Sequence, residues 1–177
     1  MKPLRLTTSA LLGCLALSSF ALPSAAVAQS SGPATAPDVV IPGRGGWETY
    51  VNRRFGTRLS YPADVFGEGE PSQDGDGRRF SSGDAQLEVF GWENSDGETA
   101  RSLQNRLVGT EGYEDVTYAR SGSGWLVLSG FRGDNIFYEK YFFSGDTIQA
   151  FGIEFPTDRK PFYAPIVERI EDSFRAG

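Results

Sequence analysis

The sequence predicts an α+β domain: an antiparallel β-sheet meander flanked by a central helix and a C-terminal helix. The first observation is a series of four segments rich in β-forming residues, separated by short turns of Gly, Ser, Asp and Asn. The segments are 116–121, 125–132, 136–143 and 147–155. Turns this short join antiparallel neighbours, so the series predicts a meander. The second observation is an apolar stripe at helical spacing near the C-terminus, and a sheet with separate helices defines the α+β class.

The first 28 residues have the pattern of a secretory signal peptide. Lys2 and Arg5 are positive, 10–22 is apolar, and Ala26–Ala28 offers small residues to a signal peptidase. As a helix the apolar stretch would span roughly 20 Å, short of the roughly 30 Å hydrocarbon core of a bilayer. We therefore expect cleavage after Ala28 and a periplasmic or secreted protein.

Cys14 leaves an alternative open at this end of the chain. Leu11–Cys14 loosely resembles a lipobox, in which the cysteine would be acylated and would hold the protein at a membrane. A lipobox ends the apolar region, whereas here the apolar stretch continues after Cys14. A cysteine that is removed with the signal peptide is the favoured interpretation.

Residues 29–46 are expected to form a flexible linker, and 47–177 a single domain. The linker is rich in Pro, Gly, Ser and Ala, a composition that cannot offset the entropy of ordering. Loss of Lys2 and Arg5 with the signal peptide would take the formal net charge from −6 to −8. An acidic domain offers no electrostatic surface for nucleic acid or anionic membranes, so neither is an expected partner.

The rest of the domain reads as short strands, one loop and two helices. Strands are predicted at 48–52, 57–61, 79–81 and 86–91, a loop at 67–77, and a helix from Thr99 to a stop at Gly109. The apolar stripe of the last helix consists of Tyr163, Ile166, Val167, Ile170 and Phe174, with Pro161 and Pro165 at its start. We expect this stripe to pack on the sheet, and Trp47, Trp92 and Trp125 to belong to the aromatic-rich core.

Several motifs carry a resemblance to known proteins. They are Phe55-Gly56, Leu59–Pro62, Asp74–Phe80, Trp125–Gly130, Ile136–Lys140, Phe155-Pro156 and Ile170–Phe174. In these the chain resembles a group of uncharacterised exported proteins from alphaproteobacteria and is similar, more distantly, to the Mog1/PsbP-like α/β/α sandwich domains. The resemblance implies this architecture and a habit of binding rather than catalysis. The roles of those relatives, with photosystem II or a small GTPase, do not transfer with a fold.

Absent residue types exclude several chemistries. The chain has no His, and its only Cys lies in the predicted signal peptide. A Ser-His-Asp or Cys-His arrangement and an ordinary zinc site are therefore excluded, and no phosphate-binding or dinucleotide-binding glycine motif is present. We expect no enzyme, no catalytic residues and no cofactor.

Two acidic patterns keep alternatives open. Glu139 and Glu154 fall on adjacent predicted strands and could serve a carboxylate-dependent hydrolase acting on glycans, which needs only two carboxyls. We expect them instead on the surface, with Glu139 beside Lys140. The loop Asp74–Gly77 resembles the start of a calcium site, but Arg78 stands where a further ligand is needed, which favours a simple turn and no metal.

The aromatic segment 136–143 suggests where a partner could bind. Alternation places Tyr138 and Phe142 on one face of the strand and other aromatic rings on the opposite face. We expect helices to cover both faces, and the alternative is a partly exposed aromatic surface with Arg132, Tyr138 and Lys140 as its polar contacts. The sequence thus favours an exported accessory or binding module of the cell envelope, whose partner is another envelope protein or a small ligand.

Overall fold

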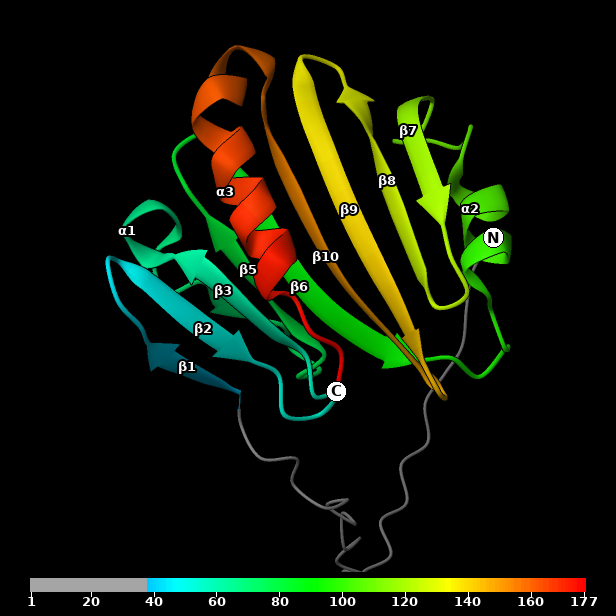
Figure 1. Ribbon diagram of the computed structural model, residues 1–177, viewed down its shortest axis with the longest axis horizontal. Coiled ribbons are helices and arrows are strands. Elements are labelled where there is room, and N and C mark those ends of the chain that lie inside the picture. The colour runs from blue at the N-terminus through cyan, green and yellow to red at the C-terminus, as the bar shows by residue number, and fades with distance from the viewer. Residues whose placement is uncertain (1–37) are drawn as a thin grey trace, which may run out of the picture. The chain divides into compact units, whose positions relative to one another are not determined.

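A seven-stranded antiparallel sheet forms the centre of the protein in the computed structural model, which describes residues 38–177 (Figure 1). The strand order is β4-β5-β6-β10-β9-β8-β7. The strands are β4 Glu70–Pro71, β5 Gly77–Ser81, β6 Gln86–Glu93, β7 Asp115–Ser121, β8 Trp125–Arg132, β9 Asn135–Ser144 and β10 Thr147–Pro156. The predicted meander is confirmed as β7 to β10, and β10 then pairs with β6 to extend the sheet.

A second, three-stranded sheet corrects the predicted linker boundary. It consists of β1 Val39–Pro42, β2 Trp47–Val51 and β3 Arg58–Pro62. We expected a linker up to residue 46, but Val39 pairs with Val51 in an antiparallel ladder and Val40 packs against the core. Three successive β-branched residues, Val39 to Ile41, favour a strand once a partner is present. The predicted signal peptide and the rest of the predicted linker lie outside the described residues.

Three helices and one 3₁₀ turn complete the fold of residues 38–177. They are α1 Ala63–Phe66, α2 Ala100–Leu107, η1 Thr157–Arg159 and α3 Lys160–Ser173. The prediction for α2 is confirmed down to its cap: Thr99 accepts a hydrogen bond from the Ser102 amide, and the Ser102 side chain accepts one from the Thr99 amide. The single turn α1 and the two-residue strand β4 were not predicted, because neither is long enough to show a periodic pattern.

Helices lie on both faces of the large sheet. On one side, which we call the α3 face, α3 packs against β3, β9 and β10, and Figure 1 shows it lying along β10, between that strand and the small sheet. The stripe of α3 is buried as predicted, and Phe174, which follows the helix, is 1% exposed. On the other side, the α2 face, Ala100 and Leu103 pack against Leu126 and Leu128 of β8. No helix among residues 38–177 has the length and apolar character needed to cross a membrane.

Candidate binding surface on the α3 face

The structure places the three predicted contact residues on two different faces of the large sheet. Side chains alternate along a strand, so Tyr138 and Lys140 of β9 face the α3 side. Arg132 of β8 pairs with Asn135 of β9 and faces the α2 side with Phe137. The prediction that Arg132 belongs to one surface with Tyr138 and Lys140 is therefore wrong.

The α3 face is open where it passes over β7 and β8. Figure 1 shows both strands lying to one side of α3. Six large apolar side chains in residues 38–177 are exposed, and three of them share this area: Tyr118 at 48%, Trp125 at 36% and Phe131 at 40%. Helices lie on both faces as expected, but each covers only part of its face: α3 contacts β9 and β10, and α2 contacts β7 and β8 on the opposite face. The expectation that Trp125 is a core residue is wrong.

A cleft of about 530 Å³ lies between this open area and α3. Its walls are Tyr118, Trp125, Val127, Tyr138, Lys140, Phe142 and Glu171. We call this the aromatic cleft. Phe142 stacks on buried Phe174, with ring centroids 5.2 Å apart, and Tyr138 stacks on Phe151 at 5.9 Å. The inner wall of the cleft is thus continuous with the core and held rigidly by it.

An ion pair closes the inner side of the aromatic cleft. Lys140 Nζ lies 2.9 Å from Glu171 Oε1, which links β9 to α3. Burial would raise the pKa of Glu171, but Lys140 and Tyr138 stabilise its charged form and hold that pKa below its usual range. Burial, with the neighbouring Glu171 charge, raises the pKa of Tyr138. Lys140 is therefore engaged within the fold and offers little free charge to a ligand.

The outer side of the cleft depends on a glycine and an unpaired cation. A Cβ on Gly122 would lie 2.7 Å from Trp125 Cε2, so only glycine leaves room for the indole where it lies. Arg120 lies over the Tyr118 ring, 6.0 Å from its centroid, and within residues 38–177 no carboxylate lies within ion-pair distance of it. The cleft thus has exposed rings in its wall and the Arg120 guanidinium beside one of them, Tyr118.

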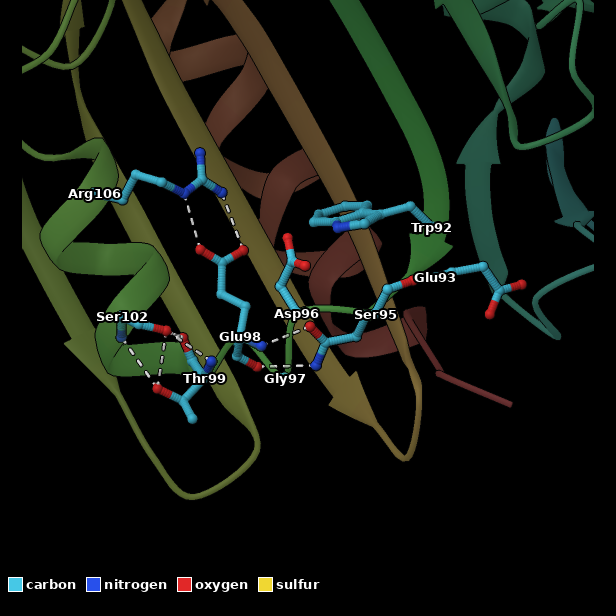
Figure 2. A pocket seen from close by; sticks show the side chains of 10 residues that line it. Trp92, Glu93, Ser95, Asp96, Gly97, Glu98, Thr99, Ser102 and Arg106 are labelled. Carbon is cyan, nitrogen blue, oxygen red and sulfur yellow. Dashed lines mark hydrogen bonds and ion pairs between the residues drawn. The ribbon is translucent and has the colours of Figure 1, made fainter.

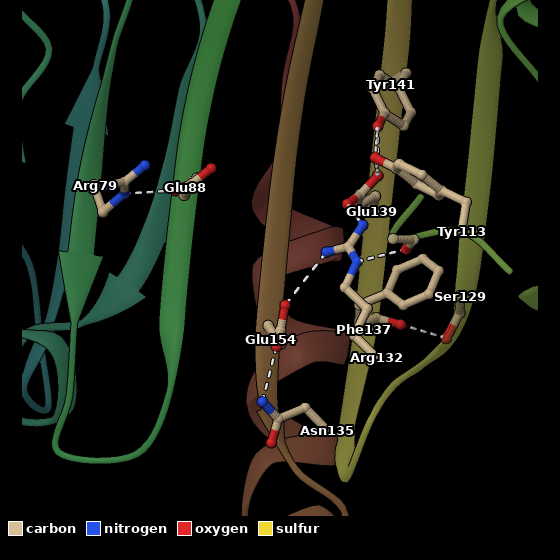
Figure 3. Close-up of polar contacts among 11 residues, drawn as sticks. Arg79, Glu88, Tyr113, Ser129, Arg132, Asn135, Phe137, Glu139, Tyr141 and Glu154 are labelled. Carbon is tan, nitrogen blue, oxygen red and sulfur yellow. Dashed lines mark hydrogen bonds and ion pairs between the residues drawn. The ribbon is translucent and has the colours of Figure 1, made fainter. Parts of the chain in front are cut away.

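Arg132 lies at the centre of a polar network on the α2 face (Figure 3). Its guanidinium donates to Glu139 at 2.6 Å, to Glu154 at 3.4 Å and to the Gly112 carbonyl at 2.8 Å. It also lies 4.1 Å from the Phe137 ring centroid. Burial would lower the pKa of Arg132, but the hydrogen bond and charge of Glu139 raise it. The bond to Gly112 ties the loop before β7 to the sheet, and the other contacts join β8 to β9 and β10.

Glu139 is not the exposed neighbour of Lys140 that we expected. It is 9% exposed, and its carboxylate accepts hydrogen bonds from Tyr113, at 2.8 Å, and from Tyr141 as well as from Arg132. Burial and the Glu139 charge raise the pKa of Tyr141, so its hydroxyl stays protonated and donates. Glu139 and Glu154 do lie on adjacent strands, β9 and β10, as predicted, and both pair with Arg132.

Another depression, of about 700 Å³, lies where β6 leads into α2 (Figure 2). Its wall includes Trp92 and the loop 94–99. Glu98 forms two hydrogen bonds with Arg106, at 2.9 and 3.0 Å, and Asn94 bonds both the amide and the carbonyl of Glu98. These bonds fix the loop at the start of α2. Among residues 38–177 no three Asp, Glu or Cys residues cluster as a metal site.

Comparisons with known proteins establish the fold. No protein-family model and no curated protein sequence matches this chain. Among solved structures, the chain is similar to the solution structure of cyanobacterial PsbP (CyanoP) from Synechocystis sp. PCC 6803. The identity is 17%, the TM-score is 0.53, and the match covers 77% of this chain and 96% of that one. The predicted distant similarity to PsbP-like domains is confirmed, and at this identity it concerns the fold alone. Membership of the alphaproteobacterial group stays a prediction.

Proposed function

We propose that this chain is a non-enzymatic, exported binding module of the cell envelope, and that the aromatic cleft binds an apolar segment of another envelope protein. The observation that carries the proposal is the gathering of Tyr118, Trp125 and Phe131 on one open face of two neighbouring strands. Aromatic side chains supply much contact area at little entropic cost, which is why they are enriched where partners bind.

The charges around the cleft indicate the chemistry of the partner. Lys140 and Glu171 neutralise each other, so the inner wall offers apolar contact and few free polar groups. Arg120 is the exposed cation at the outer side. A segment that places one large apolar side chain between Trp125 and Tyr138, and a carboxylate near Arg120, would complement both features.

The glycan hydrolase is the weaker candidate. It depends on Glu139 and Glu154, and three donors already occupy the Glu139 carboxylate. A general acid or nucleophile must be free to act on its substrate, whereas this carboxylate, although it lines a cavity of about 300 Å³ with Glu154, is 9% exposed and is held by Arg132 and two tyrosines. Glu154 is likewise engaged, by Arg132 and by Asn135 at 2.8 Å.

Photo-crosslinking and complementation in a deletion strain would test the proposal. A photoreactive phenylalanine analogue replaces Trp125 in one chain and Phe162, an exposed ring at the start of α3, in the control. We expect a specific crosslink to an apolar segment of an exported protein only from position 125. Mass spectrometry of the same samples should show a mature N-terminus at Gln29, and a retained Met1 or an acylated Cys14 would contradict the proposed export route.

The complementation arm separates the two candidate functions. We expect Trp125→Ala and Tyr118→Ala to abolish complementation while the protein stays folded, and Phe162→Ala, Glu139→Gln and Glu154→Gln to retain it. If folded Gln variants fail and the aromatic variants succeed, the binding proposal is wrong and the hydrolase takes its place.

A further inference from the structure

We propose that a second copy of this chain pairs with β7, edge to edge and antiparallel about Ala119, so that two seven-stranded sheets join into one. This goes beyond the proposed function, since the aromatic cleft of a single copy is complete without it. The argument rests on the free edge of β7, on the direction of its backbone groups and on the order of its side chains.

The edge of the large sheet at β7 has no strand partner among residues 38–177. β7 is the last strand in the sheet order and there pairs only with β8, and Figure 1 shows it at the outer side of the sheet with α2 next to it. Residues 117–121 are all exposed, on both faces of the strand. At the opposite edge, β4 has two residues, one of them Pro71, and cannot support a ladder. Unpaired backbone groups along an edge are a template for another strand.

Backbone hydrogen bonds assign the direction of each residue of β7. The Gly122 amide donates to the Trp125 carbonyl at 2.9 Å and closes the hairpin to β8. Hydrogen-bonded and non-hydrogen-bonded pairs alternate along an antiparallel ladder, so Arg120 and Tyr118 direct their backbone groups to β8. Ala119 and Ser121 therefore direct their amides and carbonyls outward, and two copies centred on Ala119 would exchange both hydrogen bonds.

The side chains around Ala119 in one copy are complementary to the same side chains in a second copy. In a two-fold antiparallel pair, Tyr118 stands opposite Arg120 of the second copy, and the reverse contact forms at the same time. Both residues lie on the α3 face, and Arg120 has no carboxylate partner among residues 38–177, so a tyrosine ring is a favourable neighbour for it. On the other face Thr117, Ala119 and Ser121 are small and meet without a clash.

The segment lacks most of the usual devices that prevent edge pairing. Natural edges carry Pro, Lys or inward charges, whereas 117–121 is Thr-Tyr-Ala-Arg-Ser. Its protection consists of the charge of Arg120 and the register shift between Val116 and Tyr118, which limits the ladder to a few residues. We therefore expect a reversible dimer, in which the two aromatic clefts lie on the same side of the joined sheet.

Sedimentation and cysteine crosslinking test this inference. Cys14→Ser removes the chain's own cysteine, and Ala119→Cys then places one thiol at the two-fold axis, where a hydrogen-bonded pair has Cα atoms about 5.5 Å apart, within disulfide range. The matched control is Gln73→Cys, exposed on the loop between β4 and β5 at the opposite edge. We expect rapid oxidation of the Ala119→Cys chain to a disulfide dimer and little from the control.

Two further variants keep the inference falsifiable. Ala119→Pro removes the outward amide and Arg120→Glu removes the cation, and each should weaken the wild-type dimer at least about tenfold without lowering the melting temperature. Trp125→Ala should remain dimeric, which separates this inference from the proposed binding function. A wild-type chain that sediments as a monomer at every concentration, or equal crosslinking at positions 119 and 73, would overturn it.

Discussion

The ion-pair partner of Glu139 is determined by the position of its side chain in the sheet and not by its neighbour in the sequence. Lys140 is its neighbour in the chain, but alternation along β9 sends that ammonium to the α3 face, where Glu171 receives it. Glu139 turns to the α2 face and meets Arg132 from the adjacent strand. Two ion pairs on opposite faces of one strand thus tie β9 to α3 on one side and to β8 on the other.

The first prediction follows from the burial of this carboxylate. Glu139→Gln leaves the Arg132 guanidinium without its closest charged acceptor. It also places the amide NH₂ of glutamine, a donor, next to the three groups that donate to the carboxylate. We expect the free energy of unfolding to fall by about 1–3 kcal/mol in urea denaturation. Glu154→Gln is the matched control, because its side chain is more exposed and its pair with Arg132 is longer, and it should cost less than about 1 kcal/mol. Equal losses from both variants would contradict this division of roles.

At the scale of elements, α3 holds the two sheets together. Phe174, at its C-terminal end, packs on Phe142 of β9 and Phe151 of β10. Directly after it, Arg175 exchanges backbone hydrogen bonds with Arg58 of β3, both at 2.9 Å. The Ser173 hydroxyl accepts a hydrogen bond from the Ser60 amide of the same strand. The end of α3 is therefore fixed to the small sheet by its backbone and to the large sheet by its rings.

We therefore expect Phe174→Ala to cost on the order of 3–5 kcal/mol, as truncation of a buried aromatic ring does. Denaturant unfolding measures this loss. Phe162→Ala, at the exposed start of the same helix, removes an equal volume and should cost less than about 1 kcal/mol. A small loss at position 174 would place the end of α3 outside the core.

At the scale of the whole molecule, the set of titratable groups predicts a broad plateau of stability. The chain has no histidine. Burial raises the pKa of Tyr50, Tyr61, Tyr113 and Tyr141, so the stability that they contribute is present below about pH 10 and falls as the unfolded chain loses their protons above it. The pKa of Glu171 is lowered, so its contribution is present above about pH 4 and is lost in acid.

The expected result is a urea midpoint that stays constant between about pH 6 and 9 and falls on both sides of that range. Tyr141→Phe should make the alkaline fall less steep, because it removes a proton that the folded state retains. A midpoint that changes steadily through neutral pH would show that some other group titrates there, contrary to this assignment.

The regular elements were determined by the sequence itself. Glycine-containing turns between β-rich segments were enough to predict the antiparallel pairing of β7 to β10, because strands joined by a short turn pair with each other. The spacing of apolar residues was enough to predict α3, and Thr99 predicted the start of α2. Val39–Ile41 was missed because a strand of this length takes its stability from its partner β2, and the Pro- and Gly-rich residues around it are typical of a linker.

The exposure of each face was decided only by the tertiary structure. Trp125, Val127 and Phe131 alternate with Leu126 and Leu128, so the pattern of β8 predicts two apolar faces and does not reveal which one is covered. α3 packs between β3 and β10 and leaves the α3 face of β7 and β8 open. The position of one helix thus turned Trp125 from an expected core residue into a wall of the aromatic cleft. Packing between elements distant in the sequence decides which face of a strand is buried, and the local periodicity of the sequence does not show this packing.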